Sequence, residues 1–283
     1  MRARLDDLVN SALAEKAAVP AFTCYDFTTA LAVVEEAEAK GRGVILLVAP
    51  KTAAARSGLR LIAALRGLAD AATVPVVVQL DHATSIEAIT TGLAAGADSV
   101  LADGSALDFE ENIEFVAAVR SSFADPTIVV EAELGGLAGN EDQAFALEAA
   151  GLTDATQVAD FIARSGAQLL AVAVGNVHGK YAGEPLLHWD LLDQISAQSA
   201  VPLVLHGASG IPAEDLAKAP AARIGKVNFN TELRTGVLRM LELETTAHRM
   251  AGENLVDLLE LWRESVRNFT DGALKMLQAE PKG

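Results

Sequence analysis

The sequence predicts an α/β protein of the (β/α)8 TIM-barrel class, and three observations lead to that prediction. Eight short apolar runs alternate with longer amphipathic stretches from one end of the chain to the other. Such alternation implies a parallel sheet, and eight units in about 250 residues match a closed barrel. No low-complexity linker or change of composition divides the chain. We therefore expect a single domain over residues 1–283, with a C-terminal helical segment from about residue 232.

The predicted strands are rich in apolar and β-branched residues and are bounded by Pro, Gly or Asp, as is typical of parallel strands buried on both faces. They cover residues 18–24, 44–49, 74–80, 99–102, 127–133, 169–174, 201–205 and 224–229. The segments between them place apolar residues at helical spacing. One spans 109–123 behind a candidate cap at Asp108, and another spans 153–165 with Thr153 and Asp154 in its N-terminal signature.

An open, doubly wound sheet is the alternative for the same alternation. Such a sheet usually has fewer strands and a Gly-rich turn after its first strand. Here the first predicted strand is followed by CYDFTT. The closed barrel is therefore favoured.

Composition excludes several classes of function. The chain has 22 basic and 38 acidic residues, a net charge of −16, so a nucleic-acid partner would meet net repulsion. A single cysteine, Cys24, excludes an internal disulfide framework and fits a reducing compartment. The N-terminal segment MRARLDDLVNSALAEK lacks the apolar region of a signal peptide, and apolar runs are far shorter than the ~20 residues of a membrane span. We expect a cytoplasmic protein with no membrane partner.

Three of the five histidines follow predicted strands at the end where barrel enzymes build their sites. His82, His178 and His206 follow the third, sixth and seventh strands, and Glu133 ends the fifth. Three neutral imidazoles around an open position are typical of catalytic zinc, and imidazole also suits other divalent transition metals. The residues therefore predict a metal at the barrel mouth, acting as a Lewis acid on a substrate oxygen.

Two acids at the same face have roles that the pattern leaves open. Asp81 directly precedes His82, and neighbours on a regular strand face opposite sides, so both reach one site only if the strand splays. Asp81 is either a partner that orients an imidazole or a general acid/base beside the metal. Glu131 shares a face with Glu133, and inward carboxylates are costly unless they are paired or metal-bound.

A candidate anion site follows the last two strands. The segment 206–210 (HGASG) has two glycines and a serine at a strand-to-helix turn, so the backbone can approach a ligand closely. The segment 228–231 leads into a helix whose first amides can bind phosphate without a positive side chain. An ordinary helix cap by Thr231 is the alternative. Lys180, near His178, is a candidate contributor.

Six segments together carry a family resemblance: LDHATS, ADGS, VEAELGGLAGNED, AVAVGNVHGKY, PLVLHGASG and KVNFNTEL. Their order and spacing resemble the class II (zinc-dependent) ketose-bisphosphate aldolases, particularly the shorter tagatose-bisphosphate-like branch. The resemblance is strong over about residues 75–235 and looser elsewhere. It implies a lyase of carbohydrate metabolism that reversibly cleaves a phosphorylated ketose to dihydroxyacetone phosphate and an aldehyde.

The resemblance also implies roles for individual residues. His82, His178 and His206 match the zinc ligands, and Glu133 matches a carboxylate that can approach the metal. Asp81 matches the residue that exchanges a proton with the aldehyde-derived hydroxyl.

Further implied features lie in the loops. Glu141, in the long segment 134–152, matches a loop glutamate implicated in proton transfer at the nucleophilic carbon. A pocket is implied for the dihydroxyacetone phosphate half, with a monovalent cation (Na⁺ or K⁺) beside it. Its residues here are Gly179, Gly207, Ala208, Ser209, Asn228, Phe229, Asn230 and Thr231, to which we add Lys180. The family further implies a homodimer or homotetramer.

Three segments depart from the family pattern. The first strand has AFTCY where Asn is expected after AF, and the second ends in APK rather than in a small-polar or Gly-rich turn. Residues 253–263 (ENLVDLLELWR) lack the Asp-Pro-Arg whose arginine reaches the far phosphate. We therefore predict that the acceptor aldehyde is not glyceraldehyde 3-phosphate, or that it is held differently, by Arg263, Arg267 or Lys51.

Three other functions are open at this point. A 6-phospho-5-dehydro-2-deoxygluconate-type aldolase would share every residue named above. A non-catalytic sugar-phosphate-binding homologue is the alternative from another class, although a pure binder needs neither Asp81 nor Glu141. A Schiff-base aldolase needs an inward lysine, and the nearest candidate, Lys226, lies at the start of its predicted strand.

Overall fold

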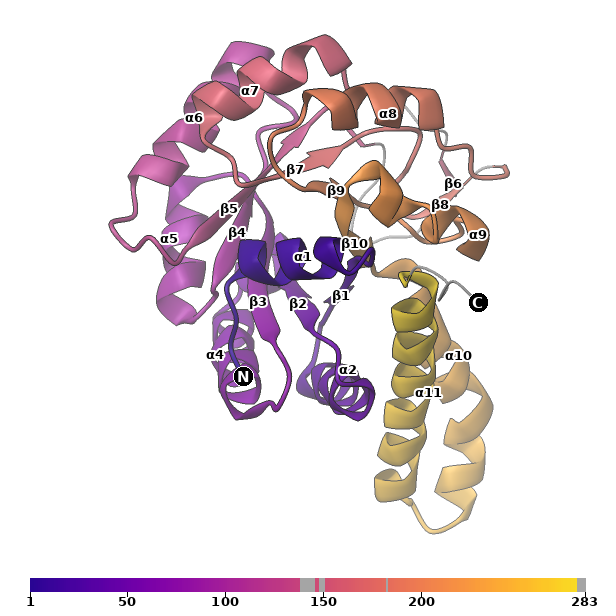
Figure 1. Cartoon of the computed structure of the whole chain (residues 1–283). Helices are drawn as coiled ribbons and strands as arrows, with labels where there is room; N and C mark the ends of the chain where they lie inside the picture. The colour runs from indigo at the N-terminus through magenta and orange to yellow at the C-terminus, as the bar shows by residue number, and fades with distance from the viewer. Residues whose placement is uncertain (138–145, 148–150, 182, 279–283) are drawn as a thin grey trace.

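Over the part of the chain that the structure describes, eight parallel strands close into a barrel (Figure 1). The computed structural model describes residues 1–137, 146–147, 151–181 and 183–278. The order around the barrel is β1-β10-β9-β7-β5-β4-β3-β2. These strands are β1 (Val19–Thr23), β2 (Val44–Val48), β3 (Val76–Ala83), β4 (Ser99–Ala102), β5 (Val129–Leu134), β7 (Leu169–Val172), β9 (Leu203–Leu205) and β10 (Ile224–Phe229). The predicted TIM barrel is confirmed, and each of these strands overlaps a predicted one.

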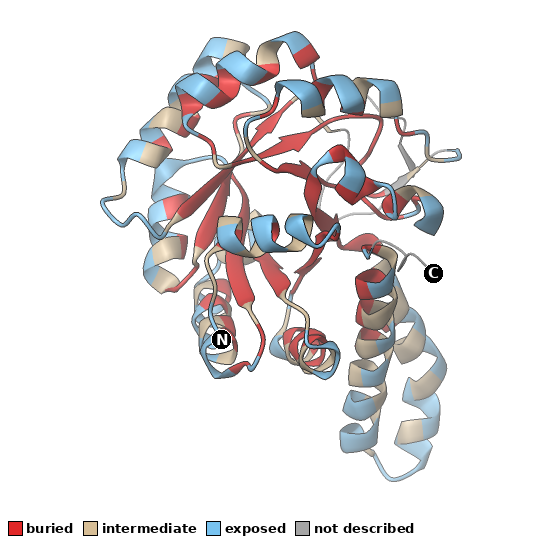
Figure 2. Cartoon of the chain, in the orientation of Figure 1, coloured by how far each residue is buried: buried red, intermediate tan, exposed pale blue. Residues whose placement is uncertain are grey.

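Helices cover the outside of the barrel, so the strands are buried on both faces (Figure 2). They are α2 (Phe27–Lys40), α3 (Pro50–Ala53), α4 (Arg56–Ala71), α5 (Ile86–Ala95), α6 (Phe109–Ser121), α7 (Val158–Ser165), α8 (Trp189–Gln198) and α9 (Ala213–Leu216), with short 3₁₀ turns at Ala155–Gln157 and Ala219–Ala222. Among the described residues, no helix is both long enough and apolar enough to span a membrane.

The two predicted helix starts differ in detail. Asp108 caps α6 as expected, since its carboxylate accepts from Glu111 N at 2.9 Å while the Glu111 carboxylate accepts from Asp108 N. Asp154 caps the 3₁₀ turn before α7. Thr153 does not act as a cap: its hydroxyl donates to Leu134 O and accepts from Ala173 N. Thr153 therefore ties the end of the 134–152 segment to the barrel instead of starting the helix.

Helix α1 (Leu5–Ala14) lies across the N-terminal end of the barrel (Figure 1). Leu5 and Val9 are fully buried and belong to the apolar cluster inside the barrel. A Cβ on Gly225 of β10 would lie 2.4 Å from Val9 Cγ1, so glycine permits this close approach. The helix thus closes the end opposite the predicted site.

Two long helices, α10 (Thr231–Met250) and α11 (Leu255–Met276), form an antiparallel hairpin that extends away from the barrel (Figure 1). Near the barrel, α11 packs against α2. A separate two-stranded sheet pairs β6 (Ala146–Leu147) with β8 (Lys180–Tyr181). This pairing joins the segment after β5 to the segment after β7, beside the barrel mouth.

Candidate metal centre and active site

The barrel interior changes from apolar to polar toward the carboxyl ends of the strands. Because side chains alternate along a strand, residues two apart point into the same interior. The inward series is Val77, Gln79 and Asp81 on β3, and Val129, Glu131 and Glu133 on β5. All the acids in these series are buried. Carboxylates inside a barrel are costly unless paired or metal-bound, so this end of the barrel is built for chemistry.

His82 reaches the same site as Asp81 because β3 is irregular at its end. The register between β3 and β4 shifts between Leu80 and Ala83. His82 itself has φ +44°, in the left-handed region that non-glycine residues seldom adopt. This is the splay that the adjacent Asp81 and His82 required. Such backbone strain concentrates at functional sites, where the surrounding structure imposes it.

The three predicted histidines converge at the mouth of the barrel. One ring nitrogen from each of His82, His178 and His206 lies within 4.8 Å of the others. The His82 ring centroid is 4.8 Å from each of the other two, and the His178 and His206 centroids are 5.7 Å apart. Each imidazole comes from a different segment of the barrel mouth. This arrangement is suited to a single transition-metal ion.

Asp103, in the segment after β4, fixes the ring of His82. Its Oδ2 lies 2.7 Å from His82 Nδ1, and its Oδ1 accepts from Ser105 N and Oγ. Although burial alone would raise it, the contacts with His82 and Ser105 hold the pKa of Asp103 well below its usual range. Since an ionised carboxylate only accepts, Nδ1 of His82 donates. Nε2 then carries the lone pair needed by a metal.

His206 is oriented in the same way by Glu131. Its Nε2 lies 2.9 Å from Glu131 Oε1, so Nδ1 carries the lone pair. Nδ1 is buried 3.5 Å from Glu133 Oε2, and neither atom has a hydrogen-bond partner among the described residues. Buried polar atoms are normally satisfied, so these two atoms are suited to a ligand from outside the chain.

The charge balance also favours a cation. Burial, together with the negative charges of Asp103 and Asp81, raises the pKa of Glu133 to about 7, despite the opposing effect of His82 and His206. A divalent ion near Glu133 would offset the cost of ionising this buried carboxylate, because it stabilises the ionised form. The donor set of imidazoles and one carboxylate therefore fits Zn²⁺ or a similar transition metal.

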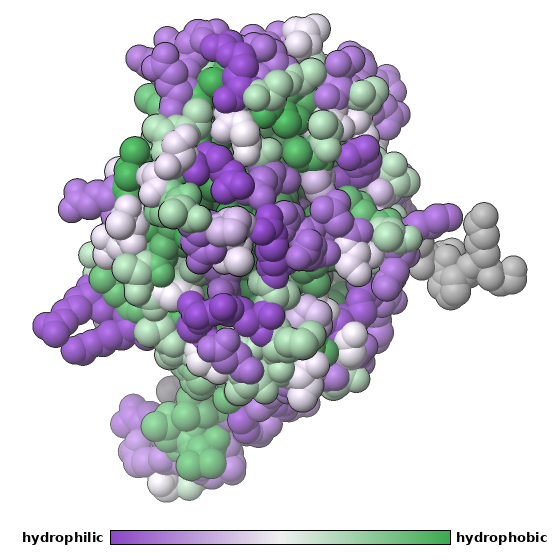
Figure 3. Space-filling view, turned by 60° about the vertical axis from the view of Figure 1, so that its left-hand side comes forward, coloured by the Kyte–Doolittle hydropathy of each residue, from purple (hydrophilic) through white to green (hydrophobic). Residues whose placement is uncertain are grey.

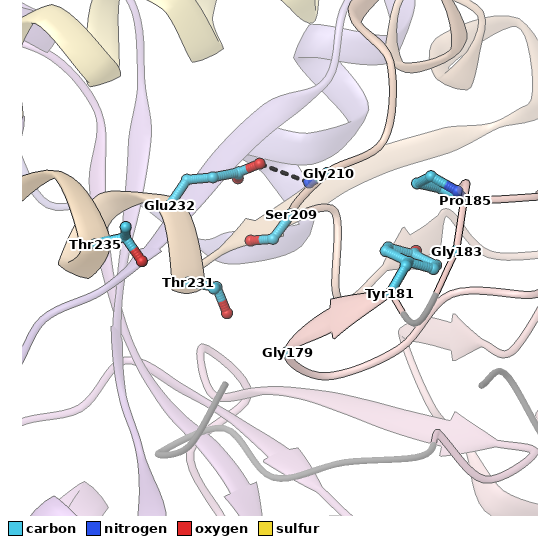
Figure 4. Close-up of a pocket in the computed structure, with 9 residues that line it drawn as sticks. All are labelled: Gly179, Tyr181, Gly183, Pro185, Ser209, Gly210, Thr231, Glu232 and Thr235. Atoms are coloured by element: carbon cyan, nitrogen blue, oxygen red, sulfur yellow. Dashed lines mark hydrogen bonds between the residues drawn. The ribbon is translucent and has the colours of Figure 1, made fainter. Parts of the chain in front are cut away.

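The predicted anion-binding segments lie together on one side of the mouth. A cavity of about 360 Å³ is lined by residues of the β7, β9 and β10 loops: Gly179, Tyr181, Gly183, Pro185, Ser209, Gly210, Thr231, Glu232 and Thr235 (Figure 4). Thr231 is the first residue of α10, and the preceding Asn230 makes no side-chain cap hydrogen bond. Thr231 and Glu232 of the first turn of α10 line the cavity, and the free amides at a helix start can bind an anion.

Asn228 and Gly207 support the same assignment. Asn228 is buried at the end of β10, and its amide oxygen and nitrogen have no hydrogen-bond partner within the described residues. Gly207 has φ +59°, and a Cβ there would lie 2.0 Å from Val177 O. Glycine therefore lets the β9 loop pack directly on the β7 loop.

The remaining predicted residues are placed as follows. Asp81 is fully buried at the end of β3, and Ala208, Phe229 and Asn230 are buried at the ends of β9 and β10. Lys180 lies in β8. Glu141 lies outside the described residues.

Three structural contacts of the site were not identified from the sequence. Asn112 of α6 donates to Glu133 O at 2.9 Å, and Asn176 donates to His206 O at 2.9 Å. Lys226 is fully buried, and its Nζ lies 2.7 Å from Glu131 Oε2. Asn112 could have been identified as a polar residue on the apolar face of a predicted helix. The lysine near the start of a buried strand is the signal for Lys226.

Two of the three residues predicted for the acceptor, Arg263 and Arg267, have partners of their own. Arg263 and Arg267 of α11 form ion pairs with Glu35 of α2 and with Glu260. These contacts hold α11 against α2. Lys51 is exposed in α3.

Comparison with known proteins agrees with this geometry. The family model for class II fructose-bisphosphate aldolase matches residues 3–282. The D-tagatose-1,6-bisphosphate aldolase subunit GatY of Klebsiella oxytoca is 40% identical over 219 residues, 77% of this chain and 77% of that protein. Solved structures that match include the YdjI aldolase of Escherichia coli K12, with TM-score 0.87, 30% identity and coverage of 100% of this chain and 99% of that one.

A putative fructose-1,6-bisphosphate aldolase of Coccidioides immitis also matches, with TM-score 0.85, 27% identity and coverage of 97% of this chain and 96% of that one. The family match extends over nearly the whole chain, and the likeness to the solved aldolases includes the barrel and its C-terminal helices. The chain therefore belongs to the class II fructose-bisphosphate aldolase family and is a metal-dependent carbon–carbon lyase of carbohydrate metabolism that acts on phosphorylated ketoses.

Proposed function

We propose that the protein cleaves its ketose phosphate to dihydroxyacetone phosphate and an aldehyde, using Zn²⁺ held by His82, His178 and His206. The observation that carries the proposal is the convergence of three imidazole nitrogens within 4.8 Å beside the buried carboxylate of Glu133. When bound, the ion offsets the negative charge that develops on the substrate oxygens as the carbon–carbon bond breaks. Glu133 is the carboxylate that can approach it.

Two acids would move the protons. Asp81 is the general base that takes the proton from the hydroxyl on the aldehyde side, so that the carbonyl of the departing aldehyde can form. Its burial at the end of β3, next in sequence to His82, supports this role, and Asp103 and Glu131 orient two of the imidazoles, His82 and His206. Glu141 would deliver a proton to the carbon left behind.

The phosphate of the dihydroxyacetone phosphate half would occupy the cavity formed by the β7, β9 and β10 loops. Backbone amides and the Thr231 hydroxyl supply donors there, and the Ser209 hydroxyl in the same wall hydrogen-bonds to Glu232 (Figure 4). The Glu232 carboxylate lies in the wall of the same cavity and accepts from Gly210 N. A monovalent cation (Na⁺ or K⁺) would offset its repulsion of the phosphate. Lys180 is a further candidate for this subsite.

We further propose that the part of the site that binds the aldehyde differs from one built for glyceraldehyde 3-phosphate. Arg263 and Arg267 are engaged by Glu35 and Glu260, so neither supports a far-phosphate site in the barrel mouth. This favours a ketose that carries one phosphate, or an acceptor bound through hydroxyl groups. Comparing kcat/KM for fructose and tagatose bisphosphates with kcat/KM for singly phosphorylated ketoses tests this point, and a clear preference for a bisphosphate contradicts it.

We also propose a homodimer or homotetramer assembled through the end of the α10–α11 hairpin. Figure 3 shows hydrophobic atoms gathered at the lowest part of the molecule. Exposed apolar residues near this end of the two helices are Leu243, Met250, Leu255, Val256 and Leu259. Met250 is 85% exposed and Val256 77%, which is unusual for apolar residues this close together. The GatY relative is named as a subunit. Light scattering on the wild type and on the Val256→Asp variant tests this surface.

A cytoplasmic location and a single catalytic domain complete the proposal. The lone cysteine, Cys24, is buried within the barrel wall and supports a reducing setting.

One combined experiment tests the function as a whole. The purified protein is assayed for bound metal and then screened for cleavage of phosphorylated ketoses, including 6-phospho-5-dehydro-2-deoxygluconate. We expect about one zinc per chain, release of dihydroxyacetone phosphate, and loss of activity with EDTA that zinc restores. Borohydride is expected to trap no covalent adduct. Ligand binding without turnover by the zinc-loaded protein would instead indicate a sugar-phosphate binder.

A further inference from the structure

An ion pair occupies the inside of the barrel directly beneath the histidines. Lys226 Nζ lies 2.7 Å from Glu131 Oε2, and Gln79 Nε2 lies 2.8 Å from the same oxygen. All three side chains are fully buried. Barrel interiors are normally filled by branched apolar residues, and a buried ion pair is weak evidence of stability because desolvation offsets the attraction. The position of the pair therefore suggests a role other than stabilisation.

The second oxygen of the same carboxylate contacts His206. Glu131 Oε1 lies 2.9 Å from His206 Nε2, while Lys226 and Gln79 occupy Oε2. With an ammonium group and an amide donating to it, the carboxylate stays ionised and can only accept. His206 Nε2 must then carry the proton, which leaves Nδ1 as the nitrogen with the lone pair.

The geometry of Nδ1 completes the chain of contacts. Nδ1 lies toward Glu133, 3.5 Å from its Oε2, and it is buried without a hydrogen-bond partner among the described residues. Its ring packs 4.8 Å from that of His82, centroid to centroid. The contacts thus run from Lys226 through Glu131 to Nε2 of His206, and the opposite ring nitrogen, Nδ1, lies toward Glu133.

We propose that Lys226, Glu131 and Gln79 form a positioning relay that fixes the tautomer and ring orientation of His206 and so presents Nδ1 to the divalent cation. The inference rests on the proposed metal site. All three residues are fully buried and act as positioning residues, not as groups that contact substrate. Lys226 is not a nucleophile, because its ammonium group is held in the ion pair with Glu131. Partners of this kind typically change metal affinity by about 10- to 100-fold.

The test uses the full-length protein with Glu131→Leu and Lys226→Met combined, so that no unpaired charge is left inside the barrel. Zinc affinity is measured by competition with a chromophoric chelator, and the His206 tautomer by NMR of ¹⁵N-histidine-labelled apoprotein. We expect an Nε2–H tautomer in the wild type, a mixed population in the double variant, and zinc affinity lower by about 10- to 100-fold. Ser99→Ala is the matched control, because it alters a buried barrel residue whose hydroxyl makes no hydrogen bond to the relay.

The outcomes separate this inference from the metal site itself. A folded double variant that keeps the wild-type tautomer and zinc affinity overturns the relay and leaves the site intact. A wild type that binds no zinc overturns both. If the double variant does not fold, Glu131→Gln combined with Lys226→Met is used, which leaves no unpaired charge and keeps the size of the side chain at position 131. An amide can either accept from or donate to the ring and so no longer requires Nε2 to carry the proton, so a mixed tautomer and a loss of zinc affinity are again expected.

Discussion

His82 and Asp103 are joined across two neighbouring strands, with Nδ1 of the imidazole 2.7 Å from Oδ2 of the carboxylate. His82 stands at the irregular end of β3 with φ +44°, and Asp103 begins the segment after β4. The strained backbone directs the ring, and the carboxylate sets which of its nitrogens donates. Two independent features of the fold therefore determine the orientation of His82 and which of its ring nitrogens keeps its lone pair.

The first prediction concerns this pair. Asp103→Asn removes the charge that holds Nδ1–H toward the carboxylate, so Nε2 is less well presented. We expect zinc affinity to fall by about 10- to 100-fold, with kcat recovered when zinc is in excess. Competition with a chelator measures the affinity. Asp108→Asn is the control, because Asn also caps the start of α6. Wild-type affinity in Asp103→Asn would argue against this role for the carboxylate.

The second prediction separates proton transfer from metal binding. Asp81→Asn keeps the size of the side chain but removes the base. We expect kcat for ketose cleavage to fall by about 10²- to 10⁴-fold while the zinc content of the purified protein is unchanged. Coupled detection of dihydroxyacetone phosphate and metal analysis measure the two quantities. The idea fails if kcat is unaffected, or if the variant loses its zinc.

The barrel and the histidines were accessible from the sequence for a simple physical reason. Parallel strands buried on both faces are recognisable as apolar runs, and a closed barrel brings the carboxyl ends of all its strands to one face. His82, His178 and His206 could therefore be grouped without knowing which strands are neighbours. The capping pattern at Asp108 was equally local, and it is confirmed.

Other features depend on contacts that local sequence does not encode. The pairing of Lys226 with Glu131 joins residues 95 positions apart and requires the strand register inside the barrel. The turn at His82 results from a shift between β3 and β4. Arg263 and Arg267 pair with Glu35, which lies more than 220 positions away in the sequence, so these ion pairs could not be predicted from local sequence.

The third prediction is a pH effect at the opposite end of the barrel. Burial raises the pKa of Asp98 from its ordinary value of 3.8 to about 6, although the hydrogen bond from Val78 N and the charge of Arg2 act in the opposite direction. Between these pH values the folded protein binds more protons than the unfolded chain, so stability falls as pH rises through the window. Asp98→Asn removes the cost of ionising this buried carboxylate, because the amide does not titrate.

We therefore expect Asp98→Asn to be more stable than the wild type, by a margin that grows from pH 4 to pH 7 and reaches about 1–3 kcal/mol, because solvent screens part of the effect at this partly exposed carboxylate. Urea unfolding of both proteins at several pH values measures the difference. Because other groups titrate equally in both proteins, only the difference is interpreted. A difference that stays constant with pH contradicts the assignment.

The fourth prediction concerns the glycine that lets two loops of the site meet. Gly207 has φ +59° and would place a Cβ 2.0 Å from Val177 O, whereas Gly166 has φ +69° with its nearest atom 3.7 Å away. Both substitutions to alanine incur the cost of a positive φ, about 1 kcal/mol. Only Gly207→Ala must also move the backbone of the β7 loop.

Gly207→Ala is therefore expected to lower the free energy of unfolding by clearly more than Gly166→Ala, and to raise KM for the phosphorylated ketose by weakening the phosphate side of the site. Urea unfolding and steady-state kinetics measure the two effects. Because the backbone conformation is similarly strained at both positions, the excess in Gly207→Ala reports the contact with Val177. Equal losses of stability in the two variants, with KM unchanged, would show that the β9 loop can shift away from the β7 loop without consequence for the substrate.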